Sequence, residues 1–108
     1  MGILTYGGST AYEIDDRTLA HLRAVIVAKL RQHQHFELSW TVEAHAGSGR
    51  VALTIDPAIP LEFSFRSAQP ERLNPRWTQA LMEGANSPRG LVLMTEAESQ
   101  EPQALDRA

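Results

Sequence analysis

The hydrophobic period changes between residues 19 and 42, and this change constrains the fold more than any other feature of the sequence. As far as about residue 33, apolar residues recur at the spacing of one helical face. That face consists of Leu19, Leu22, Ile26, Leu30 and His33. From Phe36 to Val42, apolar residues occupy every second position, which is typical of a half-buried strand. The sequence therefore predicts an amphipathic helix that leads almost directly into a strand.

Local signals upstream define where this helix starts. Asp15 can cap the helix, and Asp16 adds negative charge to its first turn. Before them, two short β-prone segments at residues 3–6 and 11–14 flank a Gly-Gly turn. That pattern predicts an N-terminal hairpin.

The segment after the first strand contains two more alternating runs. Residues 51–56 and 61–66 alternate in the same way, with an Ala-Gly-Ser-Gly turn at residues 46–49. Pro57 and Pro60 interrupt the pattern, so the chain bends there or runs along a sheet edge. We predict three consecutive strands in an antiparallel meander with one apolar face.

A second helix is predicted from Asn74, a good cap, and Pro75, which suits the first helical position. This helix is predicted to end at an Asn-Ser-Pro sequence. The apolar residues 90–94 then predict a buried strand, which suits a central position in the sheet. Trp40 and Trp77 each lie on an apolar stripe, so we expect both in the core.

These elements predict an α+β fold in one domain, residues 1–95, with the order β-β-α-β-β-β-α-β. We expect a mainly antiparallel sheet with the two helices packed on one face. Residues 96–108 hold four acids and one base, which accounts for the whole net charge of −3. They have no apolar face, so we expect an acidic, disordered C-terminal tail whose removal leaves the melting temperature nearly unchanged.

Composition excludes several classes of function. The 108 residues suit one small domain. The absence of cysteine excludes disulfides, thiolate metal sites and a cysteine nucleophile, and it fits a cytoplasmic protein. We see no signal peptide and no apolar run long enough to span a membrane. No phosphate-binding loop or nucleophile elbow is present, so we expect neither an enzyme nor a cofactor.

The histidines raise the question of a metal site. His33 and His35 lie next to Glu37, and imidazole and carboxylate groups suit zinc or nickel. However, His21 lies about three turns up the helix on another face, and the ligands of a metal site must converge. A histidine at a helix C-terminus is stabilised by the helix dipole without any metal. We therefore predict that these residues form no metal site, and that the ring of His33 lies over the edge of the core.

Basic residues suggest a contact with nucleic acid or with another partner. The candidates are Lys29, Arg31, Arg66, Arg72 and Arg76. Phosphate binding requires several cations on one surface. Residues 1–95 carry no net charge, which does not favour this function.

Several segments together resemble a family of short actinobacterial proteins of unknown function. The resemblance rests on IDDRTLAHLRAVIVAKL, FELSW, DPAIPLEFSF and LNPRWTQALMEGANSPRGLVL, and it covers about residues 1–95. Some proteins of this family carry the label "ATP-dependent DNA ligase". Such ligases need a nucleophilic lysine in a Lys-x-Asp-Gly sequence, but the sole lysine here is Lys29 in AKLRQ and no Asp-Gly pair is present.

The sequence thus favours a small binding or protein-interaction module without catalytic activity. Self-association is the expected mode, through the outer face of the sheet or through the row of Ala20, Ala24 and Ala28, whose spacing of four allows close approach of another element. The alternative is a nucleic-acid-associated accessory factor linked to DNA ligation or repair.

Overall fold

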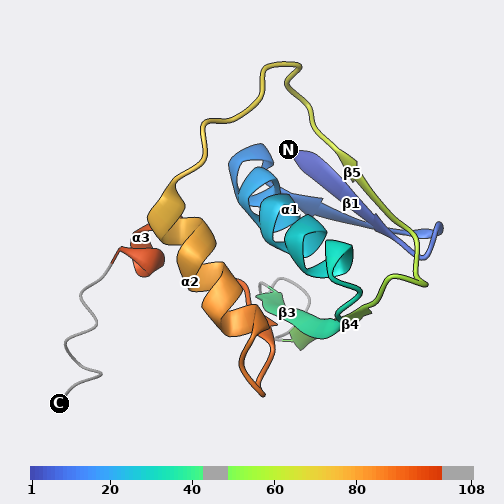
Figure 1. Ribbon diagram of the computed structural model, residues 1–108. Coiled ribbons are helices and arrows are strands. Elements are labelled where there is room, and N and C mark those ends of the chain that lie inside the picture. The colour runs from blue at the N-terminus through green and yellow to red at the C-terminus, as the bar shows by residue number, and fades with distance from the viewer. Residues whose placement is uncertain (43–48, 101–108) are drawn as a thin grey trace, which may run out of the picture.

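The computed structural model describes residues 1–42 and 49–100 of the chain. Its elements follow the order β1 (Gly2–Tyr6), β2 (Thr10–Ile14), α1 (Asp16–Arg31), β3 (Phe36–Val42), β4 (Gly49–Ile55), β5 (Leu61–Ser64), α2 (Pro75–Ala85), β6 (Leu91–Val92) and α3 (Glu96–Ser99) (Figure 1). The α+β class and the order of the first eight elements are confirmed. Most of the predicted turn at residues 46–49 lies outside the described residues.

The strands form two three-stranded sheets, so the prediction of a single sheet is wrong. One sheet has the order β2-β1-β5 and the other has the order β4-β3-β6. The predicted meander is wrong as well, because β5 pairs with β1 and not with β4. The reason lies in the predicted bend after β4, where the Gly7 N–H donates a hydrogen bond to the carbonyl of Pro60 (2.9 Å). The bend therefore directs β5 to the N-terminal hairpin.

The helices α1 and α2 lie side by side and run in the same direction (Figure 1). In the first half of α1, His21 is hydrogen-bonded to Asn74, the cap of α2. Near the end of α1, Lys29 is hydrogen-bonded to Asn86, just past the end of α2. Both predicted caps are confirmed, since Asp15 accepts a hydrogen bond from Thr18 N–H and Asn74 from Arg76 N–H. Caps therefore fix the starting points of both helices.

The C-terminus of α1 differs from the prediction. The helix ends at Arg31, and His33 adopts a left-handed conformation with φ 57°. The N–H groups of His33 and Gln34 donate to the carbonyls of Leu30 and Lys29, which is the Schellman pattern. His33 is exposed, so the prediction that its ring covers the core is wrong. Because His33 adopts the left-handed conformation and lies beyond the end of the helix, its side chain does not continue the apolar face of α1.

His33→Gly is expected to stabilise the protein by about 1 kcal/mol, because glycine adopts the left-handed conformation without the strain that a β-carbon causes. Urea unfolding measures the change. His35→Gly serves as the control, since His35 is exposed and has no positive φ; it should give no stabilisation. A loss of stability in His33→Gly would contradict the assignment of this cap.

The strand β6 is shorter and less central than predicted. It has two residues, pairs in parallel with β3 at the edge of its sheet, and leaves Val92 49% exposed. Gly90 precedes it with φ 82°, and a β-carbon there would lie 2.7 Å from the carbonyl oxygen of Glu37. Only glycine therefore permits this close approach of the two strands.

The core contains apolar residues from both sheets, α1 and α2. Trp77 is buried with 2% exposure, as predicted, whereas Trp40 is only partly buried and packs edge-on against Tyr12. Within residues 1–42 and 49–100, no helix is both long and apolar enough to cross a membrane.

Candidate functional site

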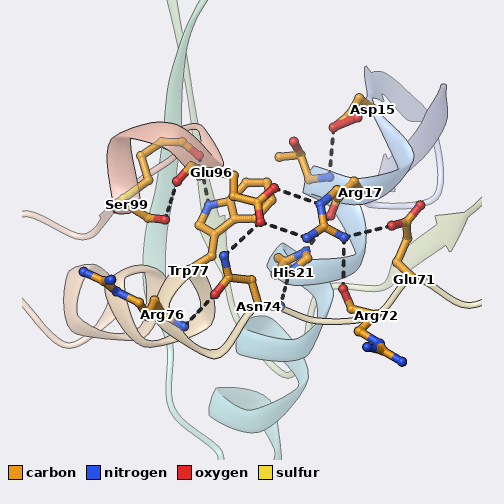
Figure 2. Close-up of polar contacts among 12 residues, drawn as sticks. Asp15, Arg17, His21, Glu71, Arg72, Asn74, Arg76, Trp77, Glu96 and Ser99 are labelled. Carbon is orange, nitrogen blue, oxygen red and sulfur yellow. Dashed lines mark hydrogen bonds and ion pairs between the residues drawn. The ribbon is translucent and has the colours of Figure 1, made fainter. Parts of the chain in front are cut away.

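A hydrogen-bonded cluster joins the start of α1 to three later parts of the chain, and we call it the Arg17 cluster (Figure 2). Its members are Arg17 and His21 of α1, Glu71 and Asn74 of the segment before α2, Trp77 of α2 and Glu96 of α3. It contains groups that are typical of active sites, namely carboxylates, an imidazole and a guanidinium. Its geometry decides whether any of them is free to react.

The guanidinium of Arg17 forms the centre of the cluster. Its Nε and Nη2 donate to the two carboxylate oxygens of Glu96 at 2.9 and 2.8 Å. Its Nη1 donates to Glu71 Oε1 at 3.1 Å and to the carbonyl of Arg72 at 2.9 Å. Arginine suits this position because its planar fork matches a carboxylate at two points. Four hydrogen bonds therefore hold this one side chain.

His21 is fully buried, and both of its ring nitrogens are bonded to the backbone. Nδ1 lies 2.8 Å from the carbonyl of Arg17, and Nε2 accepts the N–H of Asn74 at 2.7 Å. A carbonyl can only accept and an N–H can only donate, so the neutral tautomer with the proton on Nδ1 fits both contacts. The ring also stacks on Trp77, with 4.3 Å between the ring centroids. The imidazole has no nitrogen available for a substrate or metal.

Asn74 connects three elements. Its backbone N–H bonds to His21 of α1, its Oδ1 caps α2, and its Nδ2 donates to Glu96 Oε2 of α3 at 2.8 Å. Nearby, Trp77 Nε1 donates to the carbonyl of Met94 at 3.2 Å. The cluster therefore fixes the positions of α1, α2 and α3 relative to one another.

The first residues of the predicted tail are helical, which corrects the expectation of disorder from Glu96 onward. Thr95 and Glu98 form a reciprocal capping box at the start of α3, and Ser99 is buried. Glu96 pairs with Arg17 as described above. These tertiary contacts order a polar segment that has no apolar face of its own. Residues 101–108 lie outside the described residues.

Hydrogen bonds also shift the acid–base behaviour of the cluster. Those from Arg17 and then from Asn74 lower the pKa of Glu96 from 4.5 to about 2. The bonds to Glu96 and Glu71 raise the pKa of Arg17. The N–H groups of Ser67 and then Arg66 lower the pKa of Asp16. All three residues are therefore held in their charged forms at neutral pH.

Stability is expected to fall as the pH decreases from about 4.5 toward 2. The folded pKa of Glu96 lies below its ordinary value of 4.5, so its contribution is complete above that value and is lost as pH falls toward about 2. Asp16 acts in the same direction. Melting temperatures measured across this range check the expectation. Glu96→Gln should show a smaller loss than the wild type, and an equal loss in both would contradict the role of Glu96.

The Arg17 cluster is a structural junction, because its members bond to one another or to the backbone of separate elements. Among residues 1–42 and 49–100, no three histidine or acidic side chains gather where they could hold a metal ion. His33 and His35 are exposed, and His21 lies inside the cluster.

An apolar hollow lies on another side of α1, and we call it the α1 groove. Its volume is about 320 Å³, and it is lined by Ala20, Ala24, Phe65, residues 67–71 and Leu73, with Asp16 and Arg23. A second hollow shares Ala24 and Leu73 with it and extends to Val25 and Met82 of the two helices. Two members of the predicted alanine row thus line the groove, whereas Ala28 lines neither hollow.

The wall of the α1 groove, residues 66–73, is anchored by two consecutive residues of α1. The carboxylate of Asp16 accepts the N–H groups of Arg66 and Ser67 at 3.1 and 2.9 Å. Arg17 bonds to Glu71 and to the carbonyl of Arg72. The groove and the Arg17 cluster are therefore connected.

One family model matches residues 1–96, and its description reads "Domain of unknown function (DUF7882)". The chain belongs to this family. No curated protein and no solved structure gives a match. The expected membership of an uncharacterised family is confirmed, and the family description names no enzymatic activity.

The predicted contact residues differ in their exposure. Lys29 is only 8% exposed and donates a 2.6 Å hydrogen bond to Asn86 Oδ1, so its ammonium group already has a partner within the protein. Arg31, Arg66, Arg72 and Arg76 are exposed. The side chains of Arg72 and Arg76 extend from the cluster in different directions (Figure 2).

Sequence reasoning missed the role of His21. A signal was present, because His21, Val25 and Lys29 follow one another at a spacing of four beside the apolar stripe, and all three are buried. Two polar residues in such a row indicate a helix face that meets polar partners on a second element.

Proposed function

We propose that the protein is a cytoplasmic, non-catalytic interaction module that self-associates through the α1 groove. The character of the groove carries this proposal. Ala20 and Ala24 provide a part of the lining without long side chains, and Phe65 and Leu73 line the same hollow with 37% and 43% exposure. Large apolar side chains grouped on an exposed surface are typical of interaction sites.

A second copy of this chain is the occupant that we propose. A two-fold interface brings the same surface of both copies together, so that surface must be complementary to itself. The groove combines a hollow with exposed apolar side chains that such a hollow can receive. It also has charges of both signs, with Asp16 and Glu71 opposite in charge to Arg23. The neutral balance of residues 1–95 avoids repulsion between copies.

Ala24→Arg is expected to convert a dimer into a monomer, because Ala24 lines both hollows and a long charged side chain would fill them. Ala28→Arg is the matched control, since it makes the same change in the same row one turn away. Light scattering gives the mass of each protein, and melting temperatures verify that both variants fold. A monomeric wild type at its highest soluble concentration, or a dimeric Ala24→Arg variant, would overturn the proposal.

Nucleic-acid binding linked to DNA ligation or repair remains the alternative. The observation in its favour is that Arg31, Arg66, Arg72 and Arg76 are exposed and form no ion pair with another described residue. The burial of Lys29 and the neutral balance of residues 1–95 oppose it. Salt-dependent retention on DNA that is lost when Arg66, Arg72 and Arg76 are all replaced by glutamine would favour this alternative.

A further inference from the structure

One guanidinium is shared between the C-terminal helix and the wall of the α1 groove. Arg17 holds Glu96 of α3 through Nε and Nη2, and it holds Glu71 and the Arg72 carbonyl of the wall through Nη1 (Figure 2). A guanidinium is planar and rigid, so the direction of Nη1 is fixed once Nε and Nη2 are bonded. The contact with α3 therefore sets the geometry of the contact with the wall.

The end of the wall near Glu71 depends on the contact between Arg17 and α3 more than the end near Arg66 does. Asp16 holds Arg66 and Ser67 without any help from α3. At the Glu71 end, the side-chain anchor to α1 in the described part of the chain is Arg17. If α3 leaves, Nε and Nη2 lose both of their acceptors, and the Arg17 side chain is held by the hydrogen bonds of Nη1 alone. The anchor of the wall between Ser67 and Asn74 is then weaker, because the guanidinium that provides it is no longer fixed in direction.

Asn74 adds a second route between the same two parts. Its Nδ2 bonds to Glu96, while its backbone N–H, next to the wall, bonds to His21. One carboxylate of α3 thus supports both the Arg17 anchor and the residue at which the wall joins α2.

We infer that docking of α3 controls the α1 groove: the groove wall is ordered when Glu96 is bonded to Arg17 and loosens when α3 is released. This inference rests in part on the proposed function, because the consequence for self-association requires that the groove be the interface. Coupling of this kind is reciprocal. A second copy that binds the ordered groove therefore also strengthens the docking of α3.

Glu96→Ala in the full chain tests the inference, with NMR order parameters of residues 68–73 of the wall as the first measurement. We expect values near about 0.85 in the wild type and below about 0.6 in the variant. Glu83→Ala is the matched control, because Glu83 is an exposed acid of α2 whose side chain contacts only Gln79 among the hydrogen bonds described. The hairpin of β1 and β2 is the internal reference and should not change. An unchanged wall in Glu96→Ala would overturn the inference.

The dimer dissociation constant is the second measurement and separates this inference from the proposed function. We expect Glu96→Ala to raise the constant by about fivefold or more, the lower range of typical allosteric coupling. A loosened wall with an unchanged constant would overturn the control of self-association. If the wild type proves monomeric, the proposed function fails, while a loosened wall would still support the control of the wall by α3.

Discussion

Trp77→Ala is expected to lower the free energy of unfolding by about 3–5 kcal/mol, the range for removing a large aromatic side chain from a core. Trp77 is only 2% exposed and lies in the core cluster. The substitution also removes the stacking on His21 and the hydrogen bond from Nε1 to Met94. Urea unfolding, followed by circular dichroism, measures the change. A small domain has a total stability of about 5–15 kcal/mol, so the variant could be largely unfolded.

Two other variants show which part of this loss comes from which contact. Trp77→Phe keeps an aromatic ring but loses the bond to Met94, so we expect a smaller loss. Trp40→Ala should also cost less than Trp77→Ala, because Trp40 is only partly buried and packs edge-on against Tyr12. A loss below about 1 kcal/mol for Trp77→Ala would contradict its position in the core.

Those parts of the fold that local physics determines could be predicted from the sequence. The hairpin required only a Gly-Gly turn, and Gly7 and Gly8 do adopt positive φ of 65° and 79°. Both helices start at the predicted caps, because a cap is a contact between residues close in sequence. Alternation identified β3 and β4 because every second residue of a strand faces the same side of the sheet, so the pattern is a property of the local backbone.

Features that depend on distant residues could not be predicted in this way. The pairing of β5 with β1 depends on the direction of the chain after the proline-containing bend, and alternation carries no information on pairing partners. The helix α3 has a polar sequence that by itself predicts disorder. It is ordered by Glu96, whose partner Arg17 lies 79 positions earlier in the chain. Only the fold brings the two together.

In the candidate site, too, the features that depend on neighbouring residues could be predicted, and those that depend on distant residues could not. The alanine row was visible in the sequence, and two of its members line the α1 groove. The groove itself was not predictable, because its wall comes from the segment before α2. The burial of Lys29 could not be predicted for the related reason that its partner, Asn86, lies just past the end of another helix.

His21→Ala is expected to lower the free energy of unfolding by about 2–4 kcal/mol. The ring is fully buried, so its removal leaves a cavity beside Trp77. It also removes the acceptor for the N–H of Asn74, and an unpaired donor inside a protein costs about 1–3 kcal/mol. The carbonyl of Arg17 contributes less to the loss, because a helix carbonyl retains the backbone N–H four residues later as a partner. Urea unfolding measures the total.

His35→Ala is the matched control, because it makes the same chemical change at an exposed histidine and should alter stability by no more than about 0.5 kcal/mol. Amide exchange of Asn74 provides a site-specific measurement, since this N–H should exchange faster in His21→Ala than in the wild type. Equal stability of the two variants would show that the buried imidazole does not hold the cluster together. The Arg17–Glu96 pair would then be the main link between α1 and the later elements.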